Sequence, residues 1–137
     1  MKQETIKALE KEDLAMIAKR VKYQLDQLTQ EADKYSESMC EDYEYFFRWY
    51  AESMYKVQLK LSEYRKLWTV VGTGALSDVR VYLENKVKNI TYDLLNGSPR
   101  LSSTSATTSL AHTFEIEVKQ EIREKFLNYL NSMETTE

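Results

Sequence analysis

Residues 14–39 read LAMIAKRVKYQLDQLTQEADKYSESM, and apolar side chains recur along this stretch at alternating steps of four and three. This is the heptad spacing of a helix that buries one stripe of its surface. We call the stripe the first seam, and its members are Leu14, Ala18, Val21, Leu25, Leu28, Ala32, Tyr35 and Met39. Charged and amide side chains fill most of the other positions, as on a solvated face. The stretch therefore predicts a long amphipathic helix.

A second seam with the same spacing follows without an intervening glycine or proline. Its members are Tyr43, Phe47, Tyr50, Met54, Val57, Leu61, Tyr64, Trp68 and Val71. The step between the two seams is four where three was due, and a coiled coil can absorb such a stutter without ending. One interpretation is therefore a continuous helix over residues 1–71. The other is a break near residues 36–42, where Ser38 and Glu41 have capping-box spacing.

The amino-acid composition and the positions of the glycine and proline residues favour helices throughout. The 137 residues include one proline and three glycines, too few for the many turns of an antiparallel β protein. Glycines at 72 and 74 end the second seam, and Asn-Gly-Ser-Pro at 96–99 ends a third apolar stripe. We expect one all-α domain over residues 1–137, with helices at about 5–37, 40–71, 75–96 and 109–133. A Ser/Thr-rich flexible linker is expected at 98–108, and the helices are expected to form a helical hairpin or four-helix bundle that oligomerisation could complete.

The residues that most catalytic and metal sites use are scarce. His112 is the only histidine, Cys40 is the only cysteine, and neither lies in a recognisable nucleophile or zinc motif. The glycines at 72 and 74 lack the Lys-Ser/Thr pair of a phosphate-binding loop. We therefore expect no enzyme activity, no catalytic residue, no bound metal and no cofactor.

Two further features bear on location. The lone cysteine suits a reducing cytoplasm, and the first residues contain no apolar run of the kind found in signal peptides. No apolar run approaches the length of about 20 residues that spans a bilayer. We expect a cytoplasmic protein with no membrane partner.

Aromatic side chains crowd into residues 43–55, and only some of them belong to the second seam. Tyr45, Phe46, Trp49 and Tyr55 lie off the seam, so we expect other helices or another protein to cover them. Tyrosine and tryptophan are common anchors at interfaces. The sequence thus predicts a non-enzymatic protein–protein interaction module, an adaptor, assembly factor or inhibitor. Its expected partner is another protein or a second copy of itself in a homo-oligomer.

The same region supports an alternative function. Five cations, Arg48, Lys56, Lys60, Arg65 and Lys66, alternate with aromatic residues, and such mixtures bind single-stranded nucleic acid. The alternative is an accessory protein that binds single strands through the basic and aromatic face of residues 45–66. The net charge of +2 over residues 43–71 is small for a nucleic-acid footprint.

Overall fold

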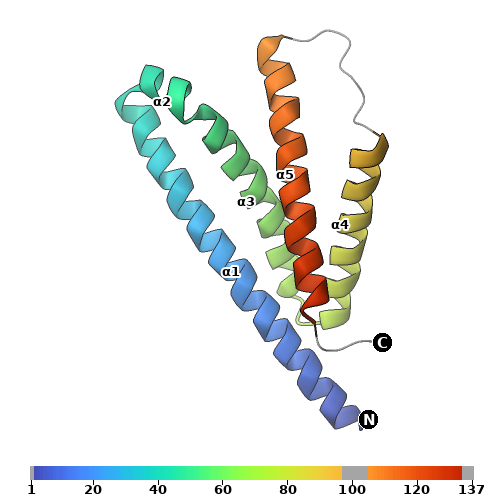
Figure 1. The fold of residues 1–137 in the computed structure, drawn as a ribbon. Helices are drawn as coiled ribbons and strands as arrows, with labels where there is room; N and C mark the ends of the chain where they lie inside the picture. Colours follow the sequence, from blue (N-terminus) through green and yellow to red (C-terminus); the bar gives the residue numbers. More distant parts are fainter. Residues whose placement is uncertain (1, 97–104, 134–137) are drawn as a thin grey trace.

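The computed structural model describes residues 2–96 and 105–133. Of these residues 92% are helical and none is in a strand, which confirms the predicted all-α class. Five helices follow one another in the described part of the chain (Figure 1). They are α1 (Gln3–Glu41), α2 (Tyr43–Trp49), α3 (Ala51–Val71), α4 (Leu76–Asn96) and α5 (Ala106–Asn131).

The four long helices form two antiparallel hairpins. In Figure 1, α1 runs to one end of the molecule, the short α2 crosses that end, and α3 returns beside α1. The second hairpin consists of α4 and α5. Helix α3 packs against all of the other long helices, so it is the central element of the fold.

The core is a single apolar cluster shared by the four long helices. Its largest fully buried side chains are Tyr64, Phe126, Ile17, Leu61, Leu67, Leu83, Ile122, Val21 and Val79. Tyr64 and Phe126 meet edge to face, with ring centroids 6.0 Å apart, and join α3 to α5. Burial of these large side chains holds the two hairpins together.

The helix is interrupted between the two seams, so residues 1–71 do not form one continuous helix. Asp42 is extended, with φ −153° and ψ 93°, and its carboxylate accepts a hydrogen bond from the Tyr45 backbone N–H at 3.1 Å. Aspartate is a preferred N-cap residue because its short side chain reaches the unpaired N–H groups of the first turn. A second irregularity at Tyr50, with φ −126° and ψ −8°, separates α2 from α3. The cap is thus Asp42, not the Ser38–Glu41 pair expected from the spacing.

This break overturns the seam prediction within α2. Tyr43 and Phe47 were expected to be buried, but they are 62% and 61% exposed, whereas the off-seam Phe46 is only 5% exposed. The extended Asp42 changes the rotational phase of the helix that follows it. Near the end of α3 one seam position differs from the prediction, because Leu67 is buried in place of Trp68, while Tyr64 and Val71 on either side are buried as expected.

Helix α5 begins earlier than its expected start at residue 109. Ser105 caps it, because the Ser105 hydroxyl accepts a hydrogen bond from the Thr108 backbone N–H at 3.1 Å. Residues 106–108 of the expected linker are therefore helical, and residues 97–104 lie outside the described part of the chain. Among the described helices, none is both long and apolar enough to cross a membrane.

Candidate interaction surface at the helix 2 end

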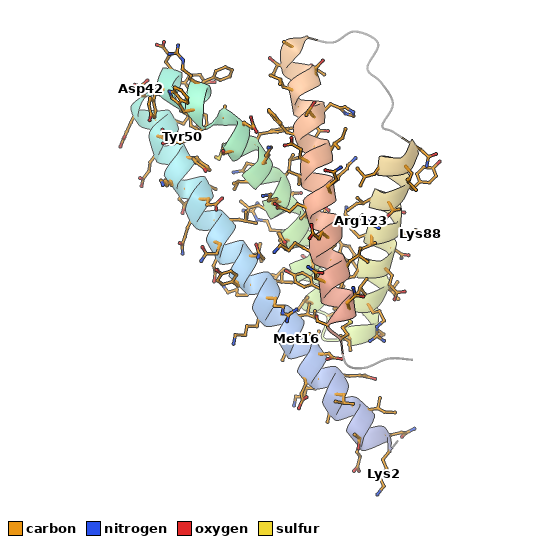
Figure 2. All side chains as sticks on the ribbon, in the orientation of Figure 1. Lys2, Met16, Asp42, Tyr50, Lys88 and Arg123 are labelled. Carbon is orange, nitrogen blue, oxygen red and sulfur yellow. The ribbon has the colours of Figure 1, made fainter. Side chains whose placement is uncertain are left out.

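Exposed aromatic side chains gather on α2. Tyr43, Tyr45, Phe47 and Trp49 are between 50% and 63% exposed within a helix of seven residues. We call these four residues the aromatic tip. Figure 2 labels Asp42 and Tyr50, which flank α2, at the end of α1 opposite Lys2. The tip therefore lies at one end of the molecule and not along its core.

Ring contacts fix the backbone that carries the tip. Tyr50 lies 5.4 Å from Tyr35 of α1 and 5.7 Å from Tyr45, between ring centroids. Tyr43 packs against Phe47 at 6.3 Å. A hydrogen bond with Tyr50 raises the pKa of Tyr45. These contacts hold α2 against α1, so the backbone that carries the exposed rings is ordered.

Of the four predicted interface residues, three are accessible and one is buried. Tyr45, Trp49 and Tyr55 are accessible, but Phe46 is buried beneath α2 beside Tyr43, with ring centroids 6.2 Å apart. Phe46 cannot touch a partner in this conformation, because the chain itself covers it. Its role here is to anchor α2, and Phe47 is the exposed phenylalanine of the pair.

A groove adjoins the tip on the side of α3 and α5. Its volume is about 440 Å³, and its apolar walls are Phe47 and Trp49 of α2, Tyr55 of α3, and Leu110 and Phe114 of α5. We call it the tip groove. Leu110 is 54% exposed, so the groove continues the apolar surface of the aromatic tip onto a second hairpin.

One hydrogen bond joins the two walls of the tip groove. The Tyr55 hydroxyl donates to Glu115 Oε2 at 2.6 Å, and this hydrogen bond raises the pKa of Tyr55. The Tyr55 and Phe114 rings also meet, with centroids 6.4 Å apart. Sequence reasoning missed the α5 wall, because nothing in the pattern of residues 109–133 says which part of α3 it faces.

The predicted basic face is largely paired with carboxylates. Lys56 binds both Glu52 of its own helix and Glu117 of α5, and these hydrogen bonds raise its pKa. Lys60 binds Glu121 of α5 at 2.7 Å. These ion pairs link α3 to α5. The lysines of one helix and the carboxylates of the other are thus complementary charges between packed helices.

The other three cations pair within their own helix or make no ion pair among the described residues. Arg48 lies 3.7 Å from Glu44, with both side chains exposed. Lys66 lies 3.5 Å from Glu63, whose carboxylate is largely buried and also binds Lys86 at 2.7 Å. Arg65 makes no ion pair with any residue that the structure describes. The five candidate nucleic-acid contacts thus leave little unpaired positive charge.

Comparison with known proteins finds no match. No family model fits the chain, and no curated protein and no solved structure is detectably similar to it. Within residues 2–96 and 105–133, no group of three or more histidine, cysteine, aspartate and glutamate side chains is placed to hold a metal ion.

A second, larger groove lies between α1 and α5. It measures about 570 Å³, and Arg20 of α1, which lines it, donates a hydrogen bond to Ser132 at 3.0 Å. Its walls include Lys19, Arg20 and Lys125, whose long side chains stay hydrated at their charged ends. The tip groove is the better candidate for recognition, because its walls carry three exposed aromatic side chains.

Proposed function

We propose that the chain is a non-enzymatic protein–protein interaction module that acts through the aromatic tip and the tip groove. The observation that carries the proposal is the exposure of four aromatic side chains on one seven-residue helix beside an apolar groove. Contiguous exposed apolar surface marks interaction sites, and tyrosine and tryptophan dominate binding hot spots. An adaptor, assembly factor or inhibitor would use such a surface.

The support beneath the tip favours tight binding. Phe46 is buried, and the Tyr35, Tyr45 and Tyr50 rings are packed together, so the backbone that carries the exposed rings is ordered before a partner arrives. A surface that is ordered before binding avoids part of the entropic cost of association. The hydrogen bond between Tyr55 and Glu115 likewise holds the groove walls in register.

The nucleic-acid alternative has weaker support from the same side chains. Phosphate binding depends on cations that can release counterions, and Lys56 and Lys60 are already engaged by Glu117 and Glu121 of α5. Among the residues that the structure describes, Arg65 is the candidate without an ion pair. Absence of binding to single-stranded oligonucleotides at low salt would remove this alternative.

The test is an affinity capture with paired variants. The wild-type chain is compared with Phe47→Ser/Trp49→Ser at the tip and with Tyr92→Ser/Leu95→Ser, a control on α4 whose side chains are also exposed. We expect a partner whose affinity falls by at least about tenfold with the tip variant and is unchanged with the control. Equal capture by all three proteins would contradict the proposal, and circular dichroism verifies that each variant stays helical.

A further inference from the structure

We propose that the tip groove takes up a cationic amphipathic helix of another protein. This inference depends on the proposed function and adds the chemistry of the partner. Its first support is the shape of the site. The apolar walls come from three helices, α2, α3 and α5, and they border an open groove of about 440 Å³ next to the exposed rings of the aromatic tip. An apolar channel bordered by helices takes up a further helix through its apolar stripe.

The second support is an uneven distribution of charge. Residues 31–52 span the end of α1, all of α2 and the start of α3, and they contain seven acidic and two basic side chains. All nine are exposed. The segment has a net charge of −5, whereas the other residues of the chain sum to +2. The negative charge is thus concentrated at the end of the molecule that carries the exposed rings.

The opposite wall of the groove does not offset this charge. The residues that line the groove include one cation, Arg48 of α2, and one carboxylate, Glu52 of α3, and no charged residue of α5. At its edge, Glu115 of α5 accepts a hydrogen bond from Tyr55, and Lys56 is bound between Glu52 and Glu117. A partner with lysine or arginine along its flanks would be attracted to this surface. An anionic partner, including a nucleic acid, would be repelled.

The third support is the affinity of aromatic faces for cations. The Lys56 ammonium already lies 5.1 Å from the centre of the ring of Phe114, which lines the groove. Trp49 and Phe47 present further rings that the chain leaves exposed. Rings of this kind attract lysine and arginine side chains as well as apolar ones.

The charge also disfavours a second copy of this chain as the occupant. A twofold-symmetric pairing would place the same surface on both subunits, so two segments of net charge −5 would face each other. Like charges across an interface oppose association. The expected homo-oligomer therefore has no support at this surface.

The experiment uses the full-length chain with Trp68→Phe, which leaves Trp49 as the only tryptophan. Three synthetic peptides of about 18 residues, about five helical turns, are titrated into it. One is a Leu/Lys amphipathic peptide, one a Leu/Glu peptide of identical pattern, and one a scrambled Leu/Lys peptide without an apolar face. Trp49 emission and its quenching by acrylamide report occupation of the groove.

We expect the Leu/Lys peptide to shift Trp49 emission to the blue and to protect it from acrylamide. Its dissociation constant should rise at least about tenfold between about 50 and about 300 mM salt. Phe47→Ser, and separately Glu44→Gln/Glu52→Gln, should weaken binding by about tenfold or more. The α4 control variants Tyr92→Ser and Glu84→Gln should leave it unchanged.

Three results would overturn the inference. Equal or tighter binding of the Leu/Glu peptide would refute the cationic partner, and the proposed function would stand if Phe47→Ser weakened that binding. Self-association at tens of micromolar that Phe47→Ser abolishes would show a second copy in the groove. Failure of every peptide to bind would refute the cationic helix as occupant, whereas the proposed function fails only if the capture experiment also shows no effect of the tip variant.

Discussion

The hydroxyl groups of Tyr82 and Tyr64 differ in whether a polar partner lies beside them in the folded chain. The Tyr82 hydroxyl is buried without a hydrogen-bond partner among the described residues, whereas interaction with the Tyr129 hydroxyl contributes, after burial, to the raised pKa of Tyr64. An unpaired buried hydroxyl costs about 1–3 kcal/mol, and a paired one contributes about 1 kcal/mol. The two side chains lie on neighbouring helices and are a matched pair for mutation.

Removing these hydroxyls should change the free energy of unfolding in opposite directions. We expect Tyr82→Phe to raise it by about 1 kcal/mol, and Tyr64→Phe to lower it by about 1 kcal/mol because the interaction with the Tyr129 hydroxyl is lost. Urea denaturation followed by circular dichroism measures both values. A destabilised Tyr82→Phe variant would mean that this hydroxyl has a partner.

The buried tyrosines also predict an alkaline limit to stability. Burial raises the pKa of Tyr64, Tyr82 and Tyr129 above the ordinary value of about 10, so the folded state favours their protonated forms. Their contribution to stability is complete below pH 10 and is lost as the pH rises above it. Absorbance at 295 nm should show these tyrosines ionising only together with loss of helical signal. Ionisation of all ten tyrosines near pH 10 in a folded chain would contradict this expectation.

At the scale of elements, the sequence predicted well which segments are helical. It predicted poorly which face of each helix is buried. The paucity of glycine and proline, together with heptad spacing, was sufficient for the all-α class. The break at Asp42 was one of two open interpretations, because a stutter and a helix end give the same apolar spacing. Aspartate directly before Tyr43 was the available signal, since it is a preferred N-cap.

Leu61 and Phe47 test this correction, because both belong to the second seam that the spacing predicts. The structure buries Leu61 and exposes Phe47. We expect Leu61→Ala to lower the free energy of unfolding by about 2–5 kcal/mol through the cavity that it leaves. Phe47→Ala should change it by no more than about 0.5 kcal/mol, as for other exposed positions. Similar losses from both substitutions would show that the seam continues through α2.

At the scale of the whole molecule, the proposed interaction surface could be only partly predicted. Excess aromatic residues off the seam pointed to residues 45–55, and three of the four chosen side chains are accessible. The α5 wall, with Leu110 and Phe114, depends on how the two hairpins pack, and a single helical pattern does not encode that packing. The pairing of Lys56 and Lys60 with α5 carboxylates was likewise hidden, because such pairs form between helices distant in sequence.

Position-specific crosslinking tests most directly whether the tip end binds a protein. The exposed Cys40 is the only cysteine and lies two residues before Asp42, so it can carry a photo-crosslinker without further substitution. A Cys40→Ser/Tyr92→Cys variant places the same reagent on the exposed face of α4 as the control. We predict crosslinks to a partner protein from position 40 that vanish with Phe47→Ser/Trp49→Ser, and none from position 92. Crosslinks from position 92 alone, or crosslinks from position 40 that survive loss of Phe47 and Trp49, would contradict the account.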